Sequence, residues 1–555
     1  MTQKFETRII HSLVKVFPDE ELQAAGPVKG SALLNEVFSY QIAFRAQHLM
    51  PAVKVKLESK LEEWITVRSI GLVPSELPIY HDHDEDVLRA TPGLYPDPLI
   101  PLTDGVVRGY PGQWRSLWIT VDPKNQVEPG LYPIVIQFET ESGEKLAEER
   151  FDLEIIGAHL PQQQLVHTQW FHTDCLATQY QTGVFSEKHW GLLEQYIQTA
   201  VDHGINMLLT PIFTPPLDTE VGGERPTVQL VDVEVTGENE YRFGFDRLKR
   251  WVDLCEKCGI KYFEFSHLFT QWGAKHAPKI MAKVNGEMQR IFGWETDASG
   301  EAYHAFLNQL LPQLVNWIRE NGIENRSYFH ISDEPTLDDI EFYASAQRIV
   351  KELLSDFPVI DALSDYDFYE KGLVQTPIPA SNHIEPFLEH EVTPLWTYYC
   401  CSQYKKVANR FFCMPSARNR ILGYQLYKYN AAGFLHWGYN FWYKQYSKGV
   451  IDPFRVTDAG GGFPSGDAFL VYPGEQGPIE SIRMEVMREA LQDMRALRLL
   501  EAWIGRDAVL AALDEGLDEE ITFSSYPRDA SWLLSKREWM NSKIKEHIGK
   551  SSVSS

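Results

Sequence analysis

The sequence has few cysteines and no long uninterrupted run of apolar residues. Its 555 residues include only six cysteines, which lack the even, dense spacing of a secreted scaffold that depends on disulfide bonds. No apolar stretch follows a basic start near the N-terminus, so we expect neither a signal peptide nor a transmembrane helix. These features together predict a cytoplasmic protein whose thiols are reduced.

Positive charge is also scarce. The chain has 52 Lys and Arg against 77 Asp and Glu, which gives a formal net charge of −25. Because this excess repels nucleic-acid phosphates and anionic lipids, we expect neither nucleic acid nor a membrane surface as a partner. A small uncharged ligand is compatible with the charge, and the oligomeric state is left open.

The N-terminal part, residues 1–160, is predicted to form an antiparallel β-sandwich. Several segments alternate apolar and polar residues or are rich in β-branched residues, and turn signals such as Pro129-Gly130 separate them. The predicted strands include Thr7–Val14, Val53–Leu57, Trp64–Ile70, Ser116–Val121 and Tyr132–Phe138.

From residue 161 the pattern changes to strands that alternate with amphipathic helices such as Glu187–His203, Phe245–Lys257, Glu301–Asn321 and Ser416–Ala432. Eight strands of this kind favour an α/β fold, a closed parallel (β/α)8 TIM-like barrel over residues 161–515, over an open doubly wound sheet. Residues 516–555 are predicted to form a helical tail. The candidate strands are Leu165–Phe171, Ile205–Ile212, Ile260–His267, Ser327–Asp333, Val359–Ser364, Thr376–Ser381, Leu395–Cys401 and Gly433–Tyr439.

Two neighbouring acids, Asp333 and Glu334, end the fourth candidate strand. In a parallel barrel this strand end belongs to the active-site face. Mutual repulsion and partial burial should raise the pKa of one carboxyl group, which supplies the acid and the base that glycosidic cleavage needs. The alternative is that the acids only cap the next helix, where Thr336 and Asp339 form a possible capping box. Since neighbours on a strand face opposite sides, the catalytic hypothesis requires the strand to end between the two acids.

The segment Tyr328–Pro335 resembles the catalytic segment of glycoside hydrolase family 123, which comprises β-N-acetylgalactosaminidases and relatives of unknown activity. The later run Gly433–Asn440 resembles the family's final strand. The loop that contains Asp452-Pro453, Gly466-Asp467 and Tyr472-Pro473-Gly474, and the helix from Ile482-Arg483 to Leu497-Arg498, also resemble the family. With the order of sandwich and barrel, the resemblance covers nearly the whole chain.

The resemblance implies retaining, substrate-assisted hydrolysis of terminal β-linked 2-acetamido sugars, without a metal or other cofactor. Glu334 would protonate the leaving oxygen and then activate water. Asp333 would orient and stabilise the 2-acetamido group while its carbonyl oxygen attacks the anomeric carbon to give an oxazolinium ion. This mechanism needs no enzyme nucleophile, which agrees with the lack of an acid in the seventh strand, Leu395–Cys401.

Aromatic and polar residues near other strand ends are candidates for binding a small saccharide. Aromatic rings on the seventh and eighth strands are expected to wall the acetamido methyl group and to stack on the sugar. Polar residues near the first, third and fifth strands are expected to bond sugar hydroxyls. The alternative for each is structural packing. The candidates are Trp396, Tyr398, Trp437, Tyr439, Trp170, His172, His267 and Asp365.

Three other motifs are predicted to bind neither a metal ion nor a phosphate group. Tyr80–Asp86 matches no closed metal-binding pattern and is predicted to be an exposed acidic loop. Cys255 and Cys258 are predicted to be buried thiols of a helix. Gly460–Gly462 lacks a preceding strand and a following lysine, so it is interpreted as a flexible active-site loop rather than a phosphate cradle.

Two other functions remain open. In a double-displacement glycosidase Glu334 would be the acid/base and a separate carboxylate the nucleophile, with Glu385 near the sixth strand as the candidate. A non-catalytic carbohydrate-binding protein could also retain the barrel, although the presence of both acids disfavours it.

Overall fold

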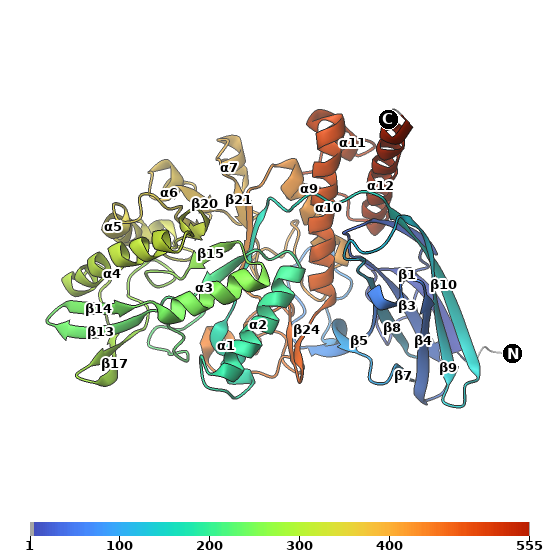
Figure 1. Ribbon diagram of the computed structural model, residues 1–555, viewed down its shortest axis with the longest axis horizontal. Helices are drawn as coiled ribbons and strands as arrows, with labels where there is room; N and C mark the ends of the chain where they lie inside the picture. The colour runs from blue at the N-terminus through green and yellow to red at the C-terminus, as the bar shows by residue number, and fades with distance from the viewer. Residues whose placement is uncertain (1–4, 554–555) are drawn as a thin grey trace.

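The computed structural model describes residues 5–553, and its N-terminal part is a β-sandwich (Figure 1). One sheet has the strand order β1-β3-β8-β5-β6 and the other β2-β10-β9-β4-β7. Apolar side chains such as Ile42, Leu117 and Ile136 are fully buried in the core of this part. The strands are β1 (Phe5–His11), β2 (Lys29–Leu33), β3 (Phe38–Ala46), β4 (Met50–Ser59), β5 (Ile65–Ser75), β6 (Gly93–Pro101), β7 (Val106–Gly109), β8 (Trp114–Val121), β9 (Gly130–Thr140) and β10 (Lys145–Ile156).

One pair of neighbouring strands departs from the predicted antiparallel arrangement. β2 and β10 run parallel, with Asp152 opposite Lys29 and Ile156 opposite Leu33. Only strands joined by a tight hairpin are forced to be antiparallel. More than a hundred residues separate β2 from β10, so no turn fixes their relative direction.

The second part of the chain contains a parallel sheet, so the fold is a mixed α/β fold. Six strands form a parallel half-barrel in the order β18-β15-β12-β11-β22-β21, and β19 and β20 form a separate parallel pair. Isolated parallel bridges, Phe329 to Val359 and Ala380 to Tyr398, lie between this pair and the two ends of the larger sheet. Every predicted strand segment contains one of the eight strands. They are β11 (Val166–Gln169), β12 (Met207–Thr210), β15 (Tyr262–Phe265), β18 (Ser327–Tyr328), β19 (Ile360–Ala362), β20 (Thr376–Ile378), β21 (Trp396–Tyr398) and β22 (Gly433–His436).

Helices follow these strands along the chain. The predicted helix Ser416–Ala432 was wrong in one respect, because it forms two shorter helices rather than one. The helices are α1 (Thr173–Gln179), α2 (Glu187–Asp202), α3 (Asp246–Cys258), α4 (Glu301–Glu320), α5 (Ile340–Val350), α6 (Asp367–Glu370), α7 (Glu385–Glu389), α8 (Ser416–Arg420), α9 (Leu422–Lys428) and α10 (Ile482–Ile504).

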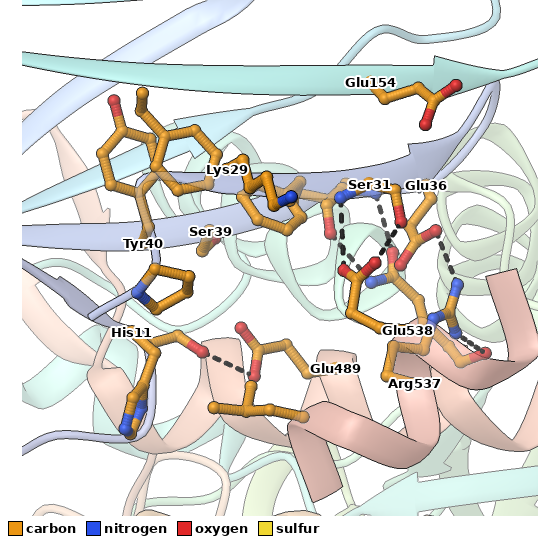
Figure 2. A pocket seen from close by; sticks show the side chains of 18 of the residues that line it. His11, Lys29, Ser31, Glu36, Ser39, Tyr40, Glu154, Glu489, Arg537 and Glu538 are labelled. Atoms are coloured by element: carbon orange, nitrogen blue, oxygen red, sulfur yellow. Dashed lines mark hydrogen bonds and ion pairs between the residues drawn. The ribbon is translucent and has the colours of Figure 1, made fainter. Parts of the chain in front are cut away.

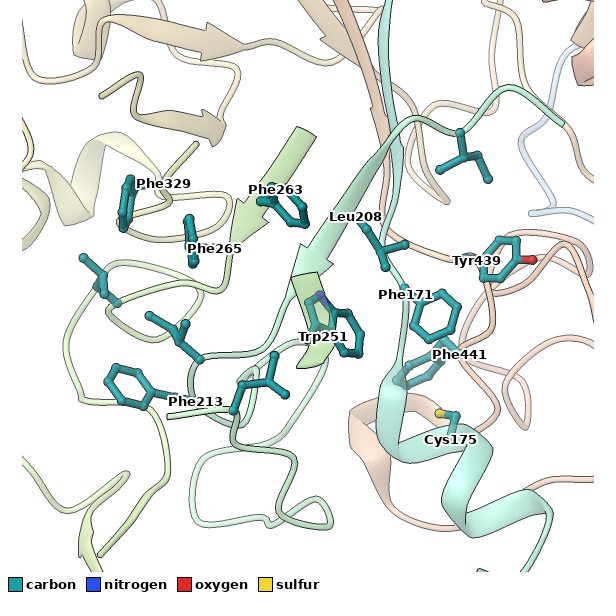
Figure 3. Packing of buried hydrophobic residues seen from close by; sticks show 14 of the residues in the cluster. Phe171, Cys175, Leu208, Phe213, Trp251, Phe263, Phe265, Phe329, Tyr439 and Phe441 are labelled. Atoms are coloured by element: carbon teal, nitrogen blue, oxygen red, sulfur yellow. The ribbon is translucent and has the colours of Figure 1, made fainter. Parts of the chain in front are cut away.

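Alternation along the strands separates two buried layers. Phe263 and Phe265 of β15 pack in the large apolar cluster that also contains Trp251 of α3 (Figure 3). The residue between them, Glu264, is fully buried and bonds to Thr168 of β11. The outer layer is therefore apolar, whereas the inner layer carries charge.

A four-stranded sheet that was not predicted lies in the loops after β12 and β15, in the order β14-β13-β16-β17. Its two hairpins carry many exposed polar residues, so they lack the apolar pattern of a buried strand. The pair Asn285-Gly286, with φ of 50° and 92°, is a hairpin signal that the sequence did contain. The strands are β13 (Asp232–Gly237), β14 (Glu240–Gly244), β16 (Ile280–Val284) and β17 (Glu287–Phe292).

The helix α10 lies between the sandwich and the parallel sheet (Figure 1) and carries buried charges. Arg483 pairs with Asp97 of β6 at 2.8 Å, and Glu485 pairs with Arg68 of β5 at 2.7 Å. Burying these charges is favourable only because each has a close partner of opposite sign. These pairs therefore hold the two parts of the chain together.

The predicted C-terminal tail begins beyond α11 (Arg506–Asp514) and forms α12 (Ala530–Val553). Arg537 of α12 pairs with Glu36 at 2.6 Å, and Glu538 accepts a hydrogen bond from the Ser31 hydroxyl at 2.8 Å. Figure 2 shows these contacts beside a cavity between the sandwich, α10 and α12. α12 is thus a packed element rather than a tail that projects from the protein.

No helix within residues 5–553 has both the length and the apolar character needed to cross a membrane. All six cysteines are free thiols, and Cys255 and Cys258 are buried on α3 as predicted.

Substitution of alanine for either of two helix glycines should change the stability of the protein in opposite directions. A Cβ atom on Gly423 of α9 would lie 2.0 Å from the carbonyl oxygen of Ala490 on α10. We expect Gly423→Ala to lower the free energy of unfolding by about 1–3 kcal/mol, because the two helices must separate. Gly191 of α2 has no atom within 4 Å of such a Cβ, so Gly191→Ala should raise stability by up to about 1 kcal/mol.

Calorimetric melting temperatures of the two variants and the wild type check this pair of predictions. Equal shifts of the melting temperature in both variants would contradict the assigned contact between α9 and α10.

Candidate active site

Asp333 and Glu334 both lie in the loop that follows β18. This strand ends at Tyr328, five residues earlier than predicted, so the alternation of a strand does not apply to the two acids. Glu334 has a φ of 43°, which is rare for a residue other than glycine, and its amide donates to the carbonyl of Ala362 at 2.9 Å. The predicted capping box of Thr336 and Asp339 is present and starts the next helical turn.

With the left-handed turn at Glu334, both carboxyl groups line the same cavity. The cavity has a volume of about 590 Å³ including its open mouth. Both acids are half-buried. The cavity is lined by Trp170, Leu217, Asp218, Gln271, Trp272, Asp333, Glu334, Ala362, Tyr398, Cys400, Cys401, Leu435, Trp437 and Phe463.

The surroundings favour the protonated form of the pair. Burial raises the pKa of Asp333 well above its usual range, and the neighbouring Glu334 charge raises it further. Burial also raises the pKa of Glu334. The Tyr398 hydroxyl donates a hydrogen bond to Glu334 Oε1 at 2.6 Å, which partly offsets this rise because it lowers the pKa. Two carboxyl groups this close bind and release protons as a pair. No Lys or Arg is among the residues that line the cavity.

A buried ion-pair network lies beside the acids. His330 Nε2 is 2.6 Å from Glu264 Oε1, and His330 Nδ1 is 3.0 Å from Asp361 Oδ1. Burial lowers the pKa of His330, but the hydrogen bonds and charges of Asp361 and Glu264 outweigh it and raise the pKa to about 9. The resulting imidazolium favours an ionised Asp333, because its charge lowers the pKa of that carboxyl group.

His267, His330 and Asp361 place possible metal-ligand atoms within 4.8 Å of one another. The two imidazole rings stack with centroids 4.2 Å apart and an angle of 18° between them. Both nitrogens of His330 already face carboxylates, so they offer no free lone pair to an ion. The geometry fits an ion-pair network better than a metal site.

Three of the predicted substrate-binding residues line the cavity. Tyr398 contacts Glu334 directly, and Trp170 donates from Nε1 to Glu264 Oε1 at 2.8 Å. Trp437 donates from Nε1 to Asp467 Oδ2 at 2.9 Å, which fixes the plane of its ring. Contact of these rings with a sugar stays a prediction.

His267 and Trp396 lie in the interior, outside the cavity. The His267 ring packs against Trp170 and His330, and neither of its nitrogens has a hydrogen-bond partner among residues 5–553. Trp396 packs against Gly433, where a Cβ atom would lie 2.1 Å from the indole ring. Neither residue is among those that line the cavity, and contact of either with a ligand stays a prediction.

Three further candidates also lie away from the cavity. The Tyr439 hydroxyl donates to the carbonyl of Tyr196 on α2 at 2.9 Å, since β22 ends at His436 and the chain then turns outward. His172 is held by the Arg225 side chain and by the carbonyl of Trp437. Asp365 lies in the turn before α6 and accepts a hydrogen bond through its backbone carbonyl.

Several cavity residues were not predicted from the sequence, because most of the candidates were residues of the strands and not of the loops that follow them. Asp218 follows β12, and Gln271 and Trp272 follow β15. Cys400 and Cys401 lie directly after β21. Their position after strand ends was a usable signal, because ligand-binding residues of such folds lie in these loops.

One of the motifs predicted to bind neither a metal ion nor a phosphate group, Tyr80–Asp86, differs from expectation, whereas the interpretation of Gly460–Gly462 as part of an active-site loop stays a prediction. The Tyr80–Asp86 loop is not simply exposed, because Asp84 accepts two hydrogen bonds from Arg418, a buried residue of α8. Gly460 and Gly461 donate from their amides to Asp458 Oδ1, and Phe463 after them lines the cavity. The Tyr80–Asp86 loop is thus bonded to α8, and the bonds of Gly460 and Gly461 lie within their own loop.

The chain resembles known glycoside hydrolases. A solved family 123 glycoside hydrolase from Clostridium perfringens, described for glycolipid glycan hydrolysis, is 16% identical and has a TM-score of 0.72, with 98% of each chain covered. An FMN-binding beta-glucuronidase from Facaelibacterium prausnitzii is 10% identical, has a TM-score of 0.34, and covers 82% of this chain and 59% of its own. An endo-beta-1,4-mannanase from Thermotoga petrophila is 13% identical, also with a TM-score of 0.34, and covers 61% of this chain and 78% of its own.

No curated protein matches the chain. The family model described as "Glycoside hydrolase 123, catalytic domain" matches residues 170–500, well over half of the chain, and this region contains the acids and the whole cavity. The protein therefore belongs to glycoside hydrolase family 123.

Proposed function

We propose that this glycoside hydrolase cleaves terminal β-linked 2-acetamido sugars, of the N-acetylgalactosaminide kind, with retention of configuration. The observation that carries the proposal is the placement of two consecutive carboxyl groups, Asp333 and Glu334, on one aromatic-lined cavity. Family membership supports it, as does a structural relative that was described for glycolipid glycan hydrolysis.

Glu334 is the general acid and base of the proposed reaction. Burial raises its pKa and so favours the protonated carboxyl group, which donates a proton to the leaving oxygen. The Tyr398 hydroxyl orients the carboxyl group and stabilises the carboxylate that proton transfer leaves behind. The same carboxylate then takes a proton from the water that attacks the anomeric carbon.

Asp333 acts on the substrate's own nucleophile. As a carboxylate it accepts a hydrogen bond from the acetamido N–H and stabilises the positive charge that develops when the carbonyl oxygen attacks the anomeric carbon. The His330 imidazolium lowers the pKa of Asp333 and so opposes the burial and the Glu334 charge that raise it. The intermediate is an oxazolinium ion, so no bond forms between the sugar and the enzyme.

The double-displacement alternative needs a second carboxylate on the cavity. Glu385 does not meet this requirement, because it is exposed at the start of α7 and does not line the cavity. Asp218 does line the cavity and is the candidate that remains for that mechanism. A non-catalytic binding protein would have no need for the paired acids.

We further infer that the eight parallel strands close into a (β/α)8 barrel within residues 161–515, after a sandwich in 1–160 and before a C-terminal segment in 516–555. The two isolated bridges join β19 and β20 to both neighbours. Inward residues from six of the eight strands, including Val166, Met207, Ile360, Ile378, Trp396 and Leu435, share one buried cluster.

Replacement of each acid should abolish most activity without loss of the fold. We expect Glu334→Gln to lower kcat by about 10²- to 10⁴-fold on an unactivated glycoside, and much less on an aryl glycoside whose leaving group needs no proton. Asp333→Asn should lower kcat on both substrates, because it acts on the nucleophile. The matched control is Asp338→Asn, an exposed acid outside the cavity. Wild-type rates in either cavity variant would contradict the assignment.

The 2-acetamido group should be essential. A substrate with a 2-hydroxyl group in its place should react at least about 10³-fold more slowly, since the nucleophile itself is missing, and a thiazoline mimic of the intermediate should inhibit. Rates on a matched pair of aryl β-glycosides measure this effect. Equal rates on the two would favour double displacement, and Asp218→Asn would then be expected to abolish activity.

Tyr398→Phe should move the pH dependence of activity in a defined direction. Activity on an unactivated glycoside needs protonated Glu334 and falls as the pH rises through its pKa. The Tyr398 hydroxyl lowers that pKa, so its removal should shift the basic limb of the kcat/KM profile to higher pH. A shift to lower pH would show that Tyr398 does not act on Glu334.

A further inference from the structure

Two large aromatic residues lie close together near the cavity and are more exposed than a purely structural role would explain. Trp272, in the loop after β15, lines the cavity and is 40% exposed, and Tyr446, in the loop after β22, is 37% exposed. Their rings meet edge to face with centroids 6.1 Å apart. Large exposed aromatic side chains beside a polar cavity are typical of a binding surface.

The backbone that carries Trp272 is unusual. Trp272, Gly273 and Ala274 have successive φ values of 56°, 113° and 58°, although left-handed backbone is unfavourable for Trp and Ala. Such strain persists only where the surroundings impose it, and it concentrates at functional sites.

Hydrogen bonds connect this strained loop to the loop after β18 that carries Asp333 and Glu334. The Trp272 amide donates to the carbonyl of Asp333 at 2.8 Å, and the Ser332 hydroxyl donates to the carbonyl of Thr270 at 2.7 Å. The backbone of Trp272 is therefore held next to the backbone of Asp333, and its ring contacts the ring of Tyr446.

Asp218 connects the loops of the two aromatic residues. Its Oδ2 accepts a hydrogen bond from the Tyr446 amide at 2.9 Å, and its own amide donates to Gln271 Oε1 at 2.7 Å. Tyr446 also has a left-handed φ, 60°. Three loops from different strands thus meet at one half-buried residue, Asp218, that lines the cavity.

We propose that Trp272 and Tyr446, held together by Asp218, form the subsite for an uncharged saccharide leaving group. The C–H face of a sugar ring packs on an aromatic ring, and the link between Trp272 and Asp333 places that ring next to the bond that breaks. This inference rests on the proposed function. It specifies the leaving group from which the 2-acetamido sugar is released.

Charge decides which saccharide fits. Asp218, Asp333 and Glu334 line the cavity, and no Lys or Arg is among its lining residues within the described chain, so an acidic sugar in the leaving-group position meets carboxyl groups without a cation on the cavity wall to balance its charge. Lys448 lies over the Tyr446 ring, but it pairs with Glu220 at 3.0 Å, which offsets its charge. A neutral hexose is accepted, and a uronic acid in its place is rejected.

The test compares three β-glycosides of the same 2-acetamido sugar, linked to methanol, to a neutral hexose and to a uronic acid. Wild-type kcat/KM should be highest for the neutral hexose and lowest for the uronic acid. Trp272→Ala should lower kcat/KM for the hexose glycoside about ten-fold and leave the methyl glycoside within about two-fold, because methanol does not reach the ring. Trp272→Phe should restore most of the loss.

Met288→Ala is the matched control, since Met288 of β17 is 63% exposed and does not line the cavity. Asp218→Asn retains an acceptor for the Tyr446 amide and should reduce the discrimination between hexose and uronic acid. Equal losses on the methyl and hexose glycosides in Trp272→Ala, or no loss on either, would overturn the subsite.

Calorimetric binding separates this subsite from the proposed catalytic function. The Glu334→Gln protein should bind the hexose glycoside more tightly than the methyl glycoside, and the added Trp272→Ala substitution should remove that difference. If the wild type cleaves none of the three glycosides and the binding difference still depends on Trp272, the proposed reaction fails but the subsite stands. If the wild type cleaves the glycosides but neither cleavage nor binding depends on Trp272, the proposed reaction stands and the subsite fails.

Discussion

Two consecutive residues can present their side chains to the same cavity only if the chain leaves the strand conformation at or before them. The site depends on this constraint. β18 has only two residues, and the left-handed backbone of Glu334 turns its carboxyl group toward the cavity that Asp333 also faces. Such a conformation costs about 1–3 kcal/mol. Hydrogen bonds from the Glu334 amide to Ala362 and from the Trp272 amide to Asp333 hold it in place.

The close approach of the two acids also affects their protonation. Carboxyl groups removed from water are stable only when they are neutral or paired. Glu264 and Asp361 share one imidazolium, His330, whereas Asp333 and Glu334 have no cation of their own on the cavity. Burial therefore favours the protonated form of this pair. The general acid that we propose needs a protonated carboxyl group.

The sequence predicted the strand segments, the acids and their helix cap, because each of these depends on local pattern. It predicted the cavity less well. Tyr439 and Trp437 are two residues apart, yet only Trp437 faces the cavity, since β22 ends at His436. Where a strand ends depends on tertiary packing rather than on periodicity. Trp272 was missed for a related reason, as its position depends on a hydrogen bond to a residue 61 positions away.

The sandwich takes part in shaping the cavity through a chain of contacts that no local pattern could reveal. Asp97 of β6 pairs with Arg483 of α10, and Arg483 donates to the carbonyls of Gly466 and Phe469. Asp467, between these two residues, fixes the Trp437 ring through its indole N–H. Loss of the sandwich would leave a buried arginine unpaired, which is strongly unfavourable, and would release the loop that holds Trp437. The N-terminal part is therefore a support for the cavity wall rather than an independent attachment.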